Sequence, residues 1–331
     1  MNKNYNIVRL TRDDDALISQ LINTASVIHN RKKDTIDWLK WKYFGSPFGE
    51  AICLIATNQK GDIAGEVTFG IYEVILNKKN IKCLISFQTM VHPNHQKKGI
   101  FSMLTKEAMR IAQNENISLV FNFPNQASFS PFLKLGYYPI NHIKNWVSFQ
   151  NKAKILLTPL SIKKPFIANS VTEINKKALH TLDELKHFIS PLNIENKIIP
   201  NRTFDFLIWR YFTYPLYEYH IVDIDSTFAI IRCGKRGKLK EVQLMELFQK
   251  EKLLNKTELK KLTKKIKEVF NPDIILCNLS ENHPVSLLMK QIKFYSLPHS
   301  INFFSFALNK DYEKLMKKEN WIITATEFHR Y

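Results

Sequence analysis

An eleven-residue motif occurs twice in this chain and constrains its fold more than any other feature. Residues 37–47 and 205–215 both read D-W/F-L-x-W-K/R-Y-F-x-x-P without a gap. Helical patterns precede each copy, and strand patterns, an amphipathic helix and one more apolar strand follow it. A repeat of this kind indicates that one structural unit occurs twice. We therefore expect two copies of one domain, at residues 1–150 and 176–331, with a connection at 151–175.

The first copy begins with helical patterns and continues as an antiparallel meander. Turn signals separate three strand patterns, at residues 51–57, 63–72 and 81–91. A helix from Gly99 and a short apolar strand at 119–123 follow, and a crossover helix favours parallel pairing of the strands on either side of it. This order predicts an α/β fold whose sheet is mixed (α+β).

The strand pattern at 81–91 leads into a polar turn and the start of a helix. Gln96, Lys97, Lys98 and Gly99 occupy this turn. The first amide N–H groups of a helix have no intrahelical acceptor, and the helix dipole adds partial positive charge there. A phosphate or pyrophosphate fits such a place. The sequence therefore predicts an anion site in the first copy.

Composition narrows the range of partners. The net charge of +18 permits an anionic partner but does not identify one, because Lys is common throughout the chain. No nucleic-acid recognition motif is present, so we expect no nucleic-acid partner. Four scattered cysteines without a C-x-x-C pair disfavour a zinc site and favour a reducing cytoplasm. No apolar run reaches the length of a transmembrane helix, so we expect a cytoplasmic protein without one.

Two motifs in the first copy carry a family resemblance. Residues 96–101 correspond to a pyrophosphate loop of the form Q/R-x-x-G-x-G/A, preceded by Val91, His92 and Pro93. A second motif, N-x-x-A/S-x-x-x-Y-x-x-x-G-F/Y, corresponds to Asn125, Ser128, Phe132, Gly136 and Tyr137. Together they resemble the GNAT superfamily of acyl-CoA-dependent N-acyltransferases. The resemblance covers about residues 5–147 and implies two GNAT-like domains in tandem.

The second copy resembles a degenerate form of the same domain. Residues 248–254 stand where the loop should recur and contain no glycine, and Lys293 stands at the place of Gly136. Residues 235–268 are strongly basic, either as a solvated helix face or as a patch for an acidic partner. Because both copies keep their tryptophan and tyrosine, we expect these rings to pack in the core or between the domains rather than to contact a ligand: Trp41, Tyr43, Trp209 and Tyr211.

The resemblance implies that acetyl-CoA or another acyl-CoA is the co-substrate, and that no metal is needed. In the family, the strand before the loop and the strand after the helix splay apart, here at 87–91 and 119–123. Backbone groups left free would pair with pantetheine and the thioester carbonyl. An amine then attacks directly, without a covalent enzyme intermediate. The residues expected to contact the co-substrate are Met90, Val91, Gln96, Lys97, Lys98, Gly99, Ile100, Phe101, Ser102, Asn125, Ser128 and Phe132.

Two residues depart from the family pattern. Phe101 replaces the second small residue of the loop, which is tolerable if its ring points into the core. Phe132 stands where many relatives have a tyrosine that protonates the departing thiolate. Phenylalanine cannot donate a proton, so another group or water must do so. Both departures leave open that this copy binds acyl-CoA but catalyses poorly.

The sequence offers several candidates for the general base. Glu66 lies on the central meander, where burial would raise the pKa of its carboxyl toward working pH. It could equally be a surface glutamate. His92 follows the splayed strand, and Asn125 either orients the thiol or caps its helix, as does Ser128. Further candidates are Glu73, His95 and, through a water, Gln88.

The sequence thus predicts an N-acyltransferase that moves an acetyl or other acyl group from CoA to a primary amine of a small molecule. An amino-sugar is the preferred acceptor class, because the long tandem form resembles GNAT enzymes of surface-polysaccharide assembly. The alternative is a non-catalytic GNAT-like binding module that docks on an anionic partner. A third option is peptidyl or aminoacyl transfer from tRNA. The sequence leaves the oligomeric state undetermined.

Overall fold

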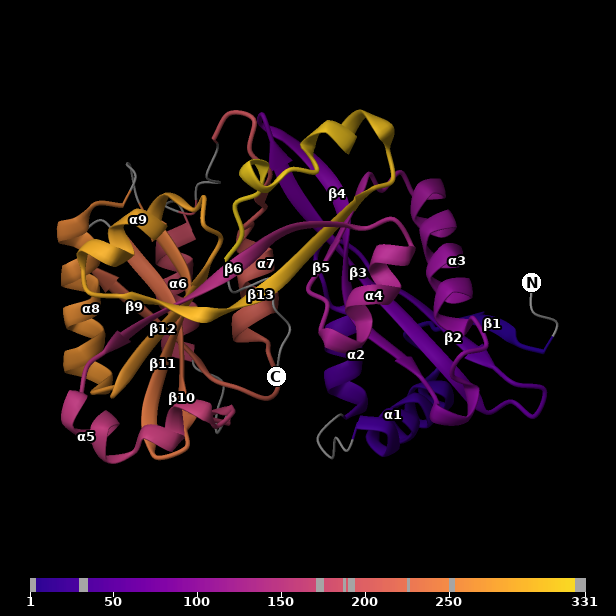
Figure 1. Ribbon diagram of the computed structural model, residues 1–331, viewed down its shortest axis with the longest axis horizontal. Helices are drawn as coiled ribbons and strands as arrows, with labels where there is room; N and C mark the ends of the chain where they lie inside the picture. The colour runs from indigo at the N-terminus through magenta and orange to yellow at the C-terminus, as the bar shows by residue number, and fades with distance from the viewer. Residues whose placement is uncertain are drawn as a thin grey trace. The chain divides into compact units, whose positions relative to one another are not determined.

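The chain forms two compact units in a computed structural model (Figure 1). The first unit comprises Met1–Ile140 with Phe303–Lys318, and the second comprises Asn141–Asn302 with Glu319–Tyr331. Within them the structure describes residues 4–29, 35–170, 176–186, 189, 194–224, 227–249 and 254–324.

The first unit is a mixed sheet with helices packed against it. In spatial order its strands are β1 (Asn6–Arg9), β2 (Ile52–Thr57), β3 (Ile63–Leu76), β4 (Lys79–Val91), β5 (Leu119–Asn122) and the end of β13 (Tyr295–Ala307). Neighbouring strands are antiparallel except β4 and β5, which are parallel. The helical elements are α1 (Asp15–His29), α2 (Ile36–Phe44), η1 (Pro93–His95), α3 (Ile100–Asn114), α4 (Gln126–Lys134) and η5 (Lys310–Leu315).

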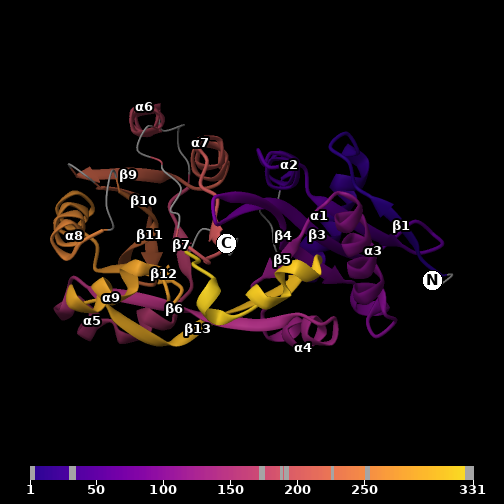
Figure 2. The same ribbon diagram turned by 90° about the horizontal axis from the view of Figure 1, so that it is seen from above.

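The two faces of this sheet are buried by different helices. On one face, Leu104 and Ala108 of α3 pack in a hydrophobic core with Val67 of β3. Successive strand residues point to opposite faces, so Glu66 and Thr68 point to the other face. There Tyr43 of α2 contacts Glu66. Figure 2 shows α2 and α4 on opposite sides of β4 and β5.

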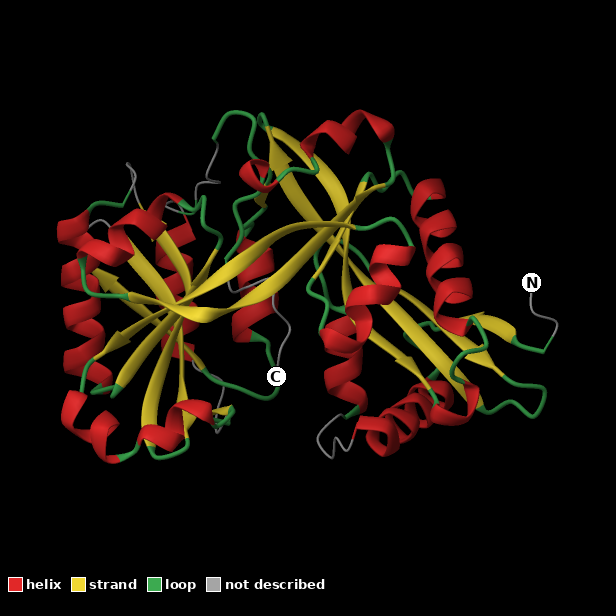
Figure 3. Cartoon of the chain, viewed as in Figure 1, coloured by secondary structure: helices red, strands yellow, loops and turns green. Residues whose placement is uncertain are grey.

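The second unit repeats this plan. Its strands are β9 (Tyr219–Ile224), β10 (Thr227–Arg236), β11 (Leu239–Gln249), β12 (Ile274–Leu279) and the end of β6 (Tyr138–Phe149), and β7 (Phe166–Ala168) also pairs with β10. Its helical elements include α5 (Lys152–Leu157), η2 (Pro159–Lys163), α6 (Lys176–Leu185), α7 (Phe204–Leu207), the π-helix η4 (Ile208–Phe212), α8 (Lys256–Phe270) and α9 (Pro284–Gln291). Figure 3 shows helices flanking the strands of each unit.

Corresponding strands of the two units have the same pairing. β10 and β11 are antiparallel with a register shift between Ile230 and Ile231, and β11 and β12 are parallel. β3 and β4 show the same kind of shift between Thr68 and Phe69 before the parallel β4–β5 pair. The repeated motif lies on α2 in one copy and on α7 and η4 in the other. The expected α/β fold with two copies of one domain is confirmed.

The two halves of the chain exchange strands. The end of β13, at Phe304–Ala307, pairs with β5, whereas Lys144–Phe149 of β6 pairs with β12. The compact units therefore divide the chain at positions other than the linear boundaries expected from sequence (1–150, 151–175 and 176–331). The segment expected as a connection contributes α5, η2 and β7 to the second unit. In the described residues no helix is long and apolar enough to span a membrane.

Candidate active site

A fork opens between β4 and β5 in the first unit. The two strands pair only from Cys83 to Ile85 on β4 and from Leu119 to Phe121 on β5. The register shift in the β3–β4 ladder, where Thr68 pairs with Gln88 and Phe69 with Ser86, forms a β-bulge at Phe87. Beyond this bulge β4 no longer follows β5. The splay lies where the family resemblance implied it on β4, but on β5 it starts only after Phe121.

The loop after β4 ends in a glycine that no other residue type would replace without strain. Gly99 has φ 78° and ψ 7° and is the N-cap of α3, with no side-chain hydrogen bond to the helix. A Cβ atom built on it would meet no atom within 4 Å. The amides of Ile100, Phe101 and Ser102 lie in the first turn, where a helix offers them no acceptor. An anion can therefore approach this helix end closely.

Five other residues expected at the co-substrate precede Gly99, in the loop and at the end of β4. Gln96, Lys97 and Lys98 are exposed, and the Lys98 ammonium donates to the Asn94 carbonyl at 3.0 Å. On β4, the backbones of Met90 and Val91 lie opposite Glu66 and Gly65 of β3.

Of the two phenylalanines that depart from the family pattern, Phe132 lies in the hydrophobic core and Phe101 packs against it. Phe132 is 2% exposed, and its ring centroid lies 5.3 Å from that of Phe101 and 4.9 Å from that of Tyr137. Phe101 thus has the orientation in which the loop can tolerate it. Burial raises the pKa of Tyr137, so its hydroxyl is a poor proton donor for a departing thiolate.

Glu66 lies at the centre of a buried polar cluster. Its Oε1 accepts hydrogen bonds from the hydroxyls of Tyr43 (2.7 Å) and Thr68 (2.6 Å). Its Oε2 is buried and has no hydrogen-bond partner among the described residues. Burial raises the pKa of the Glu66 carboxyl, although both hydrogen bonds and the charge of Lys42 act in the opposite direction. Glu66 is therefore a buried residue, and its raised pKa makes its carboxylate a stronger proton acceptor than an ordinary glutamate.

Three residues around Glu66 were not singled out from the sequence. Lys42 is 2% exposed, and its ammonium lies 4.8 Å from the ring centroid of Trp38. Cys53 and Thr68 are fully buried, and the Thr68 hydroxyl lies 3.0 Å from the Cys53 sulfur. Thr68 could have been found, because it lies two residues from Glu66 and hence on the same face of the strand. Lys42 and Cys53 come from other elements, and no sequence spacing indicates their approach.

The histidine candidates lie in the loop. The His92 amide donates to the Ala64 carbonyl at 2.9 Å, and its Nδ1 accepts from the Asn94 amide at 3.3 Å. His95 Nδ1 lies 2.9 Å from the Tyr5 hydroxyl. Burial, followed by the charges of Lys98 and His92, lowers the pKa of His95. In the described part of the chain no hydrogen bond joins either histidine to Glu66.

Asn125 and Ser128 form a capping box at the start of α4. The Asn125 side chain accepts from the Ser128 amide at 3.0 Å, and the Ser128 hydroxyl accepts from the Asn125 amide at 3.1 Å. Helix capping therefore accounts for both side chains in this structure. Glu73 lies near the β3–β4 turn, where Asn80 donates to it at 3.3 Å. Gln88 is half-exposed and lies opposite Thr68, on the same face of the sheet.

Comparisons with known proteins agree with this geometry. Residues 7–140 match the acetyltransferase (GNAT) domain family. A Saccharomyces cerevisiae N-myristoyltransferase with bound myristoyl-CoA is similar in structure, with a TM-score of 0.56, 11% identity, and coverage of 92% of this chain and 79% of that one. A tandem GNAT protein from the clavulanic acid biosynthesis pathway has a TM-score of 0.51, 11% identity, and coverage of 92% and 99%.

A third similar structure is a GCN5-related N-acetyltransferase from Anabaena variabilis, with a TM-score of 0.59, 12% identity, and coverage of 92% of this chain and 73% of that one. At these identities the likeness concerns the fold, which is that of tandem GNAT proteins. None of the curated protein sequences matches the chain.

Proposed function

The domain at residues 7–140 belongs to the GNAT superfamily, and on this premise we propose that the protein is an N-acyltransferase. It moves an acetyl or other acyl group from CoA to a primary amine of a small molecule. The observation that carries the proposal lies within the first unit. The fork between β4 and β5 follows the bulge at Phe87, and the same strand leads into the uncapped N-terminus of α3 at Gly99.

The residues at the fork and the loop fit the two polar parts of an acyl-CoA. The co-substrate supplies the activated thioester. The amides of Ile100, Phe101 and Ser102, which no side chain of the N-cap occupies, would hold the pyrophosphate. The exposed Lys97 and Lys98 add positive charge beside it. The edge of β4 at Met90 and Val91 would pair with the pantetheine amides and fix the thioester for attack.

Glu66 is the base that this geometry favours. An attacking amine must lose a proton, and a buried carboxylate with a raised pKa accepts it more readily than an ordinary one. Because Glu66 is fully buried, the proton would reach it through the Thr68 hydroxyl, which lies opposite the half-exposed Gln88. His92 and Asn125 remain proposed catalytic residues. Asn125→Asp tests the latter role, since aspartate keeps the helix cap but removes the amide donor.

The nearby Tyr137 hydroxyl does not replace the missing tyrosine at Phe132, because it is buried against Met109. The departing thiolate, with an ordinary thiol pKa of about 8.5, would then take its proton from water. Acetyl is the default acyl group, and an amino-sugar is the acceptor class that we propose. The cytoplasm, with its reduced thiols and its acyl-CoA, is the proposed compartment.

The test combines ligand binding with turnover. We expect acetyl-CoA to raise the melting temperature of the full chain and Gly99→Glu to abolish this effect. Gly61→Glu is the matched control, because Gly61 also has a positive φ of 86° and open space around it, but lies in the β2–β3 turn. Thiol release from acetyl-CoA, screened against an amine library that includes amino-sugars, then identifies the acceptor.

Two results would contradict the proposal. The first is the absence of any melting shift with acyl-CoAs at roughly millimolar concentration. The second is a clear shift without thiol release for any amine, which would favour a non-catalytic module. Steep salt dependence of binding to an anionic polymer would then support docking on an anionic partner.

A further inference from the structure

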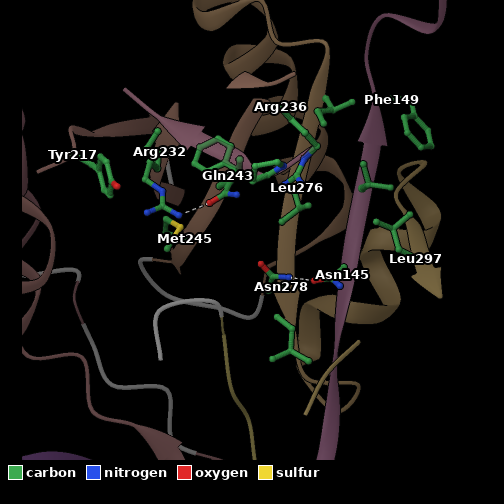
Figure 4. A pocket seen from close by; sticks show the side chains of 16 residues that line it. Asn145, Phe149, Tyr217, Arg232, Arg236, Gln243, Met245, Leu276, Asn278 and Leu297 are labelled. Atoms are coloured by element: carbon green, nitrogen blue, oxygen red, sulfur yellow. Dashed lines mark hydrogen bonds between the residues drawn. The ribbon is translucent and has the colours of Figure 1, made fainter. Parts of the chain in front are cut away.

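A pocket of about 490 Å³ lies within the second unit (Figure 4). Val242 and Leu244 of β11 point into the core with α8, and the alternate residues Gln243 and Met245 line the pocket. The pocket therefore lies on the face of the sheet that α8 does not cover. Its size falls in the range of small-molecule sites.

The lining carries positive charge and no carboxylate. Its charged residues are Arg232 and Arg236 of β10, and no Asp or Glu is present among the described lining residues. Arg236 is neutralised, because its guanidinium forms a two-pronged ion pair with Glu241 and also donates to the Lys164 carbonyl at 2.9 Å. The charge that remains in this pocket therefore belongs to Arg232.

Arg232 is buried but its charge is not balanced. It is 7% exposed and forms no ion pair with a carboxylate in the described part of the chain. Its Nη2 donates to Gln243 Oε1 at 2.6 Å, and its buried Nε has no acceptor among the residues that the structure describes. Buried charges in proteins are ordinarily paired, so a missing anion is the simplest complement.

Aromatic rings hold this guanidinium in place. Its central carbon lies 5.1 Å from the ring centroid of Phe166 and 5.7 Å from that of Tyr217. Burial opposes ionisation of Tyr219, but the charges of Arg210 and Arg232 outweigh it and lower the pKa of this phenol. The positive charge of Arg232 thus acts on the neighbouring phenol. The Arg232 side chain is held by the surrounding rings before a ligand binds.

The second unit keeps the fork but not the phosphate site. Glu241–Leu244 of β11 pair with Ile274–Cys277 of β12, and the register shift between β10 and β11 forms a β-bulge at Met245, as the shift between β3 and β4 does at Phe87 in the first unit. The N-terminus of α8 is filled by its own side chains, because Asn255 accepts from the Glu258 amide at 3.0 Å. A ligand at this fork must therefore take its counter-charge from a side chain.

We propose that this pocket binds a small organic monocarboxylate with an apolar body. The carboxylate accepts hydrogen bonds from Arg232, and the body lies against Met245, Leu276 and Phe149, which Figure 4 shows on β11, β12 and β6. One unbalanced guanidinium matches a monoanion. A phosphate monoester carries close to two charges at neutral pH and would leave one of them without a partner.

The experiment measures binding to the full chain by isothermal titration calorimetry, with three probes of equal chain length: octanoate, octanol and octyl phosphate. We expect octanoate to bind with one-to-one stoichiometry and at least about tenfold more tightly than either other probe. Arg232→Gln should weaken octanoate binding by about tenfold or more. The matched control is Lys235→Gln, which removes the same charge from an exposed position on the same strand and should change the affinity by less than about twofold.

A second variant keeps the arginine and fills the pocket. Leu276→Trp should abolish octanoate binding while its circular dichroism spectrum remains that of the folded protein. If Arg232→Gln does not fold, this variant alone tests whether octanoate binds in the pocket. The proposal is overturned if octanol binds as tightly as octanoate, if octyl phosphate binds more tightly, if Lys235→Gln weakens binding as much as Arg232→Gln, or if octanoate shows no saturable binding. These readouts involve no acyl transfer, so they succeed or fail independently of the proposed enzyme activity.

Discussion

The two units begin their equivalent crossover helices in opposite ways. In the first, α3 starts at Gly99 and has no side-chain cap. In the second, α8 starts at Asn255, whose side chain accepts from the amides of Thr257 and Glu258, while Glu258 accepts from the Asn255 amide. The second copy thus provides its own carboxylate where the first is open to an external anion. One fold position is thus an open helix end in the first unit, where we propose the binding site, and a self-contained helix end in the second.

The buried glutamates that contact the repeated motif differ between the two units in a related way. Glu66 and Glu246 each accept a hydrogen bond from the tyrosine of the repeated motif, Tyr43 at 2.7 Å and Tyr211 at 3.0 Å. Glu246 also forms an ion pair with Arg202 at 2.7 Å. Glu66 has no such partner among the described residues, and burial raises the pKa of its carboxyl. A paired carboxylate serves structure, whereas the carboxyl of the first unit is able to take up a proton.

The largest effect is therefore expected at Glu66. If Glu66 is the base, Glu66→Gln should lower kcat by about 100-fold or more and leave the KM for acetyl-CoA nearly unchanged. Steady-state thiol release with the identified acceptor measures both constants. Glu246→Gln is the paired variant, and it should lower stability by up to about 3–5 kcal/mol, because Arg202 then lacks its carboxylate, with little change in kcat. Equal losses of kcat in both variants would remove the distinction between the two residues.

Stability should also depend on pH through Glu66. Its pKa is raised in the folded state, so the folded protein holds a proton that the unfolded chain has released above about pH 4.3. The free energy of unfolding therefore falls as pH rises from there through the folded pKa. Glu66→Gln should remove this fall, as urea unfolding at several pH values would show. A wild-type slope that persists in the variant would assign it to another group.

The next effect concerns the open helix end. Ser102 holds the third position of α3, as Glu258 does in α8. Ser102→Glu should therefore close the site with an internal carboxylate and weaken acetyl-CoA binding by about tenfold or more, while stabilising the helix by roughly 0.5 kcal/mol. Ser102→Gln has the same shape without the charge and should bind with nearly wild-type affinity. Calorimetric titration separates the two, and equal affinities would show that this helix end does not hold the co-substrate.

Local sequence patterns predicted the family resemblance and the tandem fold. They did not predict the side-chain contacts that complete the two sites. The loop at Gly99 and the meander are contiguous in sequence, so spacing alone indicates them. The exchange of β6 and β13 depends on pairing between strands that are far apart in the chain, which no local period reveals. Lys42 and Arg232 look like ordinary surface cations in a sequence with net charge +18. Only the packing around them shows that they are buried.

The smallest expected effect lies at the end of the helix after the fork. Gly136 follows α4 with φ 87°, and Lys293 follows α9 with φ 67°, so the second unit keeps the left-handed turn without its glycine. A non-glycine residue is strained there, and the greater freedom of glycine in the unfolded chain offsets part of that strain. Lys293→Gly should therefore stabilise the protein by about 0.5 kcal/mol, measured by urea unfolding.

The matched control for this substitution is Lys290→Gly, which places glycine within α9 and should cost about 1 kcal/mol. Opposite signs for the two variants would mean that the backbone conformation of the first copy persists at Lys293, where it now costs stability. If Lys293→Gly destabilises the protein as much as Lys290→Gly does, the lysine side chain contributes packing that outweighs its strained backbone. The second unit would then have adapted to the loss of its glycine.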